Sequence, residues 1–176
     1  MARNISLIGF RGTGKTTVGK LLAQRIGFLC VDTDEVIEQR SGRSITELFE
    51  QRGEAEFRDI ESEVIAELTA KTGRVLSLGG GAILREANRE RIRACGPVVW
   101  LRANVVTIAQ RMDLDPTTAA RRPNLTSAGG TAEIEDLLRE RLPLYEACAS
   151  LAIDTDHRSP EELVDSIVND CGLHAG

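Results

Sequence analysis

Aromatic residues and net positive charge are both scarce in this chain of 176 residues. Phe, Trp and Tyr together make up 3% of the sequence, which argues against a platform for stacking nucleic-acid bases. The formal net charge is −5, whereas a general nucleic-acid binder is usually basic. Both properties therefore predict a protein that has no nucleic-acid partner.

Paired cysteines and long apolar runs are missing as well. The four cysteines form no Cys-x-x-Cys pair and only two histidines accompany them, so the sequence predicts no zinc site and four reduced thiols. No apolar run reaches the roughly 18 residues of a membrane span, and the run near the first residue is too short for a signal peptide. We expect a soluble cytoplasmic protein without a membrane partner.

Short apolar runs alternate with longer amphipathic ones along the chain. Hydrophobic residues at 41% and charged residues at 28% are typical of a globular protein, and the length suits one domain over 1–176. The apolar runs predict buried strands at 4–9, 28–32, 74–79, 97–101 and 150–154. The amphipathic runs predict helices at 14–27, 56–68, 131–145 and 159–172.

This alternation predicts an α/β fold, a five-stranded parallel sheet with helices on both faces, because parallel neighbours need crossover connections. Gly27 suits the end of the first helix, and Ser159 with Pro160 suits the start of the last. The segment 113–130 has little periodicity and is rich in Thr, Ala, Pro and Gly. Long loops inside compact domains are usually functional, so we expect a mobile functional loop there.

A phosphate-binding loop is predicted near the first strand. The stretch "GFRGTGKTT" at 9–17 fits G-x-x-x-x-G-K-[ST] between a strand and a helix. Its glycines let backbone N–H groups converge on phosphate, and the following helix adds its positive dipole end. Lys15 can reach the β and γ phosphates, and the Thr16 hydroxyl can bind Mg²⁺. A glycine-rich turn that binds nothing is the alternative, which the flanking strand and helix disfavour.

Two predicted strands end in the same tripeptide, Asp32-Thr33-Asp34 and Asp154-Thr155-Asp156. Ligands of open α/β sheets bind at the carboxyl ends of strands, so both tripeptides lie on the correct edge. Asp32 could hold the Mg²⁺ shell, and Asp34 could accept a proton from a substrate hydroxyl. The alternative for either pair is a helix N-cap, for which Asp34 is well placed.

Two further stretches suit a small anionic substrate. Arg58 and Glu61 lie three residues apart on a predicted helix, so they share a face. Arg58 could bind an anion while Glu61 holds it in place, or the two could form an ordinary ion pair on the surface. Gly79, Gly80 and Gly81 follow a predicted strand, where they permit close backbone approach to a ligand or simply form a turn.

Taken in order, these motifs resemble those of the shikimate kinases over essentially the whole chain. The ordered set is "GFRGTGKTT", "DTD", "GEAEFRDIE", "LGGGA", "RRP" and "RLPLY". The resemblance implies a P-loop kinase with a mobile lid at about 113–130 and a substrate-binding helical region at about 34–61. It implies transfer of the ATP γ-phosphate to the 3-hydroxyl of shikimate, in the route to aromatic amino acids.

The resemblance also implies roles for residues at matching positions. Asp34 would hold the hydroxyls and act as base, Arg58 and Arg141 would bind the carboxylate, and Glu61 would orient Arg58. Gly80, between Gly79 and Gly81, would supply a backbone contact. The pocket under the ring would be lined by Ile45, Phe49 and Phe57. ATP would be contacted by Gly12, Thr13, Gly14, Lys15, Thr16, Thr17, the lid residue Arg122, and Arg158 and Pro160 beside the adenine.

The lid departs from the usual family pattern, and other P-loop proteins offer rival interpretations. This chain reads Arg122-Pro123-Asn124-Leu125 where R-P-L-L is usual, and about four extra residues follow Arg111. Gluconate and adenylate kinases share the first motif but lack the pairing of "GEAEFR" with "RLPLY". A GTPase switch would need N-K-x-D, which does not occur. A binding protein that has lost catalysis is the third rival. We expect a monomer.

Overall fold

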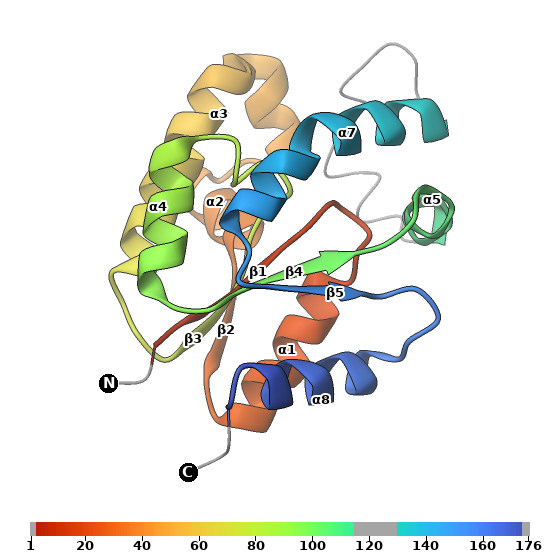
Figure 1. Cartoon of the computed structure of the whole chain (residues 1–176). Helices are drawn as coiled ribbons and strands as arrows, with labels where there is room; N and C mark the ends of the chain where they lie inside the picture. The colour runs from red at the N-terminus through yellow and green to blue at the C-terminus, as the bar shows by residue number, and fades with distance from the viewer. Residues whose placement is uncertain (1–2, 115–129, 174–176) are drawn as a thin grey trace.

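The computed structural model describes residues 3–114 and 130–173, which form a parallel sheet between two layers of helices (Figure 1). The five strands run in the order β2-β3-β1-β4-β5. Their bounds are β1 Ile5–Ile8, β2 Leu29–Asp32, β3 Arg74–Ser77, β4 Val98–Arg102 and β5 Leu151–Asp154. The predicted α/β fold and all five predicted strands are therefore confirmed.

The helices divide between the two faces of the sheet (Figure 1). In chain order they are α1 Lys15–Ile26, α2 Thr33–Ser41, α3 Ile45–Thr69, α4 Glu86–Cys95, α5 Val105–Leu114, α7 Gly130–Cys148 and α8 Pro160–Asp170. Helices α1 and α8 pack on one face, while α3, α4 and α7 lie over the other. None of the described helices is both long and apolar enough to span a membrane.

The three central strands β1, β3 and β4 are almost fully buried because each face of the sheet has its own core. On the α1 and α8 face, Val18 and Ile167 pack around Leu7 of β1. On the opposite face, Phe57 and Tyr145 pack around Ile8 of the same strand. Every residue of β1 is buried, which fixes the strand that leads into the glycine-rich loop at the centre of the sheet.

Helix ends follow the predicted capping residues. Gly27 has φ 71° and donates its N–H to Ala23, which closes α1. Ser159 accepts a hydrogen bond from the Glu162 N–H, and the Glu162 side chain bonds back, which forms a capping box in front of Pro160.

Helix α3 is longer than the helix predicted at 56–68 and is bent. It begins at Ile45, behind a capping box of Ser44 and Glu47, and continues to Thr69 across a break at Gly53. Gly53 has φ 79° and ψ 170°, a conformation that is essentially restricted to glycine. The bend brings the Phe49 and Phe57 rings together, with centroids 4.6 Å apart.

Candidate active site

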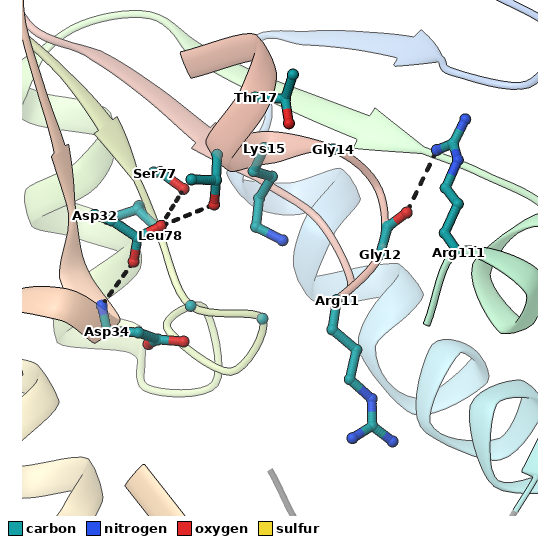
Figure 2. A pocket seen from close by; sticks show the side chains of 13 residues that line it. Arg11, Gly12, Gly14, Lys15, Thr17, Asp32, Asp34, Ser77, Leu78 and Arg111 are labelled. Atoms are coloured by element: carbon teal, nitrogen blue, oxygen red, sulfur yellow. Dashed lines mark hydrogen bonds between the residues drawn. The ribbon is translucent and has the colours of Figure 1, made fainter. Parts of the chain in front are cut away.

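A cavity of about 310 Å³ lies at the carboxyl ends of β1, β2 and β3 (Figure 2). Strand β1 has β3 on one side and β4 on the other, the kind of switch point where open α/β sheets bind ligands. The cavity is lined by Arg11, Gly12, Gly14, Lys15, Thr16, Thr17, Asp32, Asp34, Ser77, Leu78, Gly79, Gly80 and Arg111. The predicted phosphate loop, first Asp tripeptide and glycine run thus meet at one place.

The glycine-rich loop between β1 and α1 depends on glycine at specific positions. A Cβ on Gly9 would stand 2.4 Å from the Leu101 carbonyl oxygen, and Gly14 has φ 89° at the N-cap of α1. Lys15 is 9% exposed, and its Nζ donates to the carbonyl oxygens of Gly9 at 2.9 Å and Phe10 at 2.8 Å. The loop therefore places a buried ammonium group beside the N-terminus of a helix, where anions are stabilised.

Asp32 joins three elements through its two carboxylate oxygens (Figure 2). Its Oδ2 accepts hydrogen bonds from Thr16 Oγ1 at 2.9 Å and Ser77 Oγ at 3.0 Å. Its Oδ1 accepts from the Asp34 N–H at 3.0 Å, so Asp32 is the N-cap of α2. The alternative that Asp34 caps this helix is wrong, and Asp34 instead lines the cavity from the first turn of α2.

Arg58 and Glu61 form a buried ion pair, so the surface-pair interpretation is wrong. The Arg58 and Glu61 side chains are 7% and 0% exposed, and Nη1 lies 2.7 Å from Oε2. Glu54 adds a second contact at 3.1 Å, and the guanidinium lies 5.1 Å from the Phe57 ring centroid. A buried guanidinium held on two sides by carboxylates keeps a fixed orientation.

The glycine run after β3 separates Arg58 from Arg141. A Cβ on Gly81 would lie 2.4 Å from Arg58 Nη1, so this arginine packs directly on the backbone. Arg141 of α7 donates to the Gly80 carbonyl oxygen at 3.3 Å, and the Tyr145 hydroxyl donates to the same oxygen at 2.7 Å. Within the described ranges, no carboxylate lies at ion-pair distance from Arg141, which is 6% exposed. That guanidinium is suited to an anionic ligand.

The nucleotide side matches the predictions less closely. Arg158 and Pro160 are not among the residues that line the cavity. The Arg158 guanidinium bonds Ser166 Oγ at 2.6 Å and the Glu162 carbonyl at 2.9 Å, both on α8. Arg158 precedes α8, and its side chain is directed along that helix because Glu162 and Ser166 offer acceptors there. The structure therefore does not bring these two predicted adenine contacts into the described cavity.

Arg111 does line the cavity and ties it to the second Asp tripeptide. Its guanidinium bonds Thr155 Oγ1 at 2.9 Å and the Thr155 carbonyl at 3.0 Å. Burial alone would raise the pKa of Asp156, but hydrogen bonds from Thr107 and Asn104 and nearby positive charge hold this pKa below its ordinary value. The predicted lid falls largely on 115–129, so Arg122 lies outside the described residues.

The comparisons with known proteins all indicate the same family. The family model for shikimate kinase matches residues 11–172. A shikimate kinase of Thermodesulfovibrio yellowstonii is 45% identical over 96% of this chain and 94% of its own length. One of Rhodopirellula baltica is 43% identical over 94% and 89%. The chain belongs to the shikimate kinase family. The solved shikimate kinase of Acinetobacter baumannii in complex with shikimate is 37% identical, with a TM-score of 0.89 over 96% of this chain and 92% of that one.

Sequence reasoning missed three residues of this shikimate kinase site. Ser77 anchors Asp32, and its place at the end of a predicted strand was an available signal. Arg11 occupies a variable position of the phosphate-loop motif, which gives no reason to select it. Glu133, on α7, contacts Arg11 from 122 positions away, and no local pattern indicates that contact.

Proposed function

We propose that this cavity carries out the reaction of the shikimate kinase family. The chain is an ATP-dependent phosphotransferase that transfers the γ-phosphate to the 3-hydroxyl of shikimate, which gives shikimate 3-phosphate and ADP. The observation that carries this conclusion is the family match over nearly the whole chain. It is supported by two buried arginines that pack against neighbouring glycines of one turn beside the phosphate loop.

Shikimate carries one carboxylate and several hydroxyls, and the cavity together with the two arginines packed against its glycine run offers a complement to each. Arg58 and Arg141 bind the carboxylate through forked, charge-assisted hydrogen bonds. Glu61 holds Arg58 in place, as the 2.7 Å contact supports. Asp34 accepts hydrogen bonds from the hydroxyls and takes the proton of the 3-hydroxyl as it attacks. Gly79, Gly80 and Gly81 let the acceptor approach the backbone closely.

The phosphate loop supplies the binding and charge neutralisation that phosphoryl transfer requires. Backbone N–H groups from Gly12 to Thr17 contact the phosphates, and Lys15 moves from the loop carbonyls to the γ-phosphate. The Thr16 hydroxyl and the Asp32 carboxylate are hard oxygen donors held 2.9 Å apart, which suits Mg²⁺. When bound, Mg²⁺ neutralises charge on the β- and γ-phosphates.

The remaining ATP contacts are proposed at the edge of the site. Arg158 and Pro160 flank the adenine, since their loop is bonded through Thr155 to Arg111 in the cavity. Arg122, which directly precedes Pro123, supplies positive charge to the phosphates when both substrates are bound. We further propose that the protein acts as a monomer in the cytoplasm, without nucleic-acid or membrane partners.

An acceptor panel tests this function against its rivals. ADP release from ATP and Mg²⁺ is measured with shikimate, gluconate and AMP offered separately, each against ATP alone. We expect turnover with shikimate well above the rate without acceptor, and no increase with the other two. Turnover with gluconate or AMP, or none with any acceptor, would overturn the assignment.

A further inference from the structure

Arg11 extends from the phosphate loop toward the acceptor side of the cavity. It lines the cavity together with Asp34, Gly79 and Gly80, the residues assigned to shikimate. In Figure 2 its side chain runs in the direction opposite to that of Arg111, which lies beside Gly12. Its side chain is only 11% exposed. A long charged side chain is therefore held inside the site and does not extend into solvent.

A buried carboxylate of another element holds this arginine. The Glu133 side chain is 1% exposed in the first turn of α7, and its Oε1 lies 3.4 Å from Arg11 Nη2. Removing a carboxylate from water is costly unless it is paired, and such pairs add little net stability. A pair of this kind is better explained by the orientation it gives to Arg11 than by stabilisation of the fold.

Arg11 and Arg141 lie near the same ring and the same backbone. Each guanidinium carbon is 5.7 Å from the centroid of the Phe10 ring. A Cβ placed on Gly80 would be 3.6 Å from the backbone nitrogen of Arg11 and 3.7 Å from Arg141 Nη1, so Gly80 lies between the phosphate loop and Arg141. Helix α7 carries both Glu133 and Arg141, so one helix orients two cations around Phe10.

We propose that Arg11 is a third arginine for the carboxylate of shikimate and that Glu133 is its positioning residue. A guanidinium has five N–H donors on several edges, so it can contact Glu133 and a ligand carboxylate at once. Arg11 contacts the substrate, whereas Glu133 acts only through Arg11. This inference rests on the proposed function, since shikimate is the ligand it concerns.

The first test replaces Arg11 by methionine, which has a long uncharged side chain. Loss of one charged hydrogen-bond partner should raise the KM for shikimate roughly tenfold or more. The KM for ATP should change much less, because the loop backbone binds the phosphates. Arg11→Lys keeps the charge but loses the forked geometry of the guanidinium. Its KM for shikimate should lie between those of the wild type and Arg11→Met. Arg139→Met on the exposed side of α7 is the matched control and should leave both KM values unchanged.

The second test asks whether Glu133 acts through Arg11. Glu133→Gln should raise the KM for shikimate, whereas the exposed neighbour Glu135→Gln should not. Added to Arg11→Met, Glu133→Gln should have no further effect on that KM. If Glu133→Gln raised the KM for shikimate by the same factor in the wild type and in Arg11→Met, the positioning role of Glu133 would be overturned.

The third test identifies the group that Arg11 contacts. A shikimate analogue with a hydroxymethyl group in place of the carboxylate is measured as an inhibitor of the wild type and of Arg11→Met. Its Ki should be similar for the two proteins, because the ionic contact is absent from both complexes. The inference would be overturned if Arg11→Met raised the KM for shikimate and the Ki of the alcohol by a similar factor. It would also be overturned if the KM values for shikimate and ATP rose equally. Either result leaves wild-type turnover intact, whereas failure of the proposed function would abolish turnover in the acceptor panel.

Discussion

Two carboxylates two positions apart have different tasks in this site. Asp32 caps α2 and binds Thr16 and Ser77, so its carboxylate holds the loop, the strand and the helix together at the proposed Mg²⁺ site. Asp34 lies one position further into the helix and faces the cavity. Sequence alone left Asp34 open between helix cap and base, because an aspartate at that position suits both roles. In the structure, Asp32 is the last extended residue before α2 and caps the helix, so Asp34 falls inside the first turn and does not serve as the cap.

Asp34→Asn tests the base directly, since the helix cap belongs to Asp32. The amide keeps the size of the side chain but cannot accept the proton of the hydroxyl. We expect kcat to fall by about 10²- to 10⁴-fold. The melting temperature should stay close to that of the wild type. Glu35→Gln removes a negative charge from the same first turn of α2 and should leave kcat nearly unchanged. Near-normal kcat in Asp34→Asn would show that another group takes the proton.

At the scale of elements, the turn after β3 presents bare backbone, without a side chain of its own, to helix α3. Gly81 leaves room for the Arg58 guanidinium, and the bend at Gly53 folds the Phe49 half of α3 over the Phe57 half. The sequence pattern predicted only the second half of α3, because Gly53 interrupts the apolar periodicity in front of it. Neither close packing nor a bend can be predicted from periodicity alone.

Gly81→Ala should disturb the acceptor side more than the nucleotide side. The added methyl group would stand 2.4 Å from Arg58 Nη1, so the guanidinium must move. We expect the KM for shikimate to rise by about tenfold, the effect of losing a charged hydrogen-bond partner. The KM for ATP should change little. Gly19→Ala is the control, because it crowds Leu7 and Cys30 at 3.3 Å, away from the cavity.

That control should lower the melting temperature without a selective change in either KM. Overpacking a buried site typically costs about 1–3 kcal/mol of stability. If Gly81→Ala raised the KM for ATP as much as that for shikimate, Arg58 would not be an acceptor residue.

At the scale of the whole molecule, the sequence predicted more of the sheet than of its connections. Each of the five apolar runs corresponds to a strand, because short apolar runs differ clearly from the longer amphipathic runs between them. Helices α4 and α5 were not predicted, and α2 was expected only within the helical region at about 34–61 that the family resemblance implies, since each is short and only partly apolar. The phosphate loop could be predicted because its residues are contiguous in the sequence. The Arg11–Glu133 contact was not, because it joins residues 122 positions apart that only the fold brings together.

The position of the phosphate in the product tests the central claim most directly. After turnover with ATP and Mg²⁺, correlation of the phosphorus signal with the ring protons by NMR assigns the modified hydroxyl of shikimate. We expect phosphate on the 3-hydroxyl alone. Asp34 lies in the same cavity as Lys15, and we propose that Arg58 and Arg141 hold the carboxylate in a fixed orientation. Phosphate on another hydroxyl, or only free inorganic phosphate, would contradict the central claim.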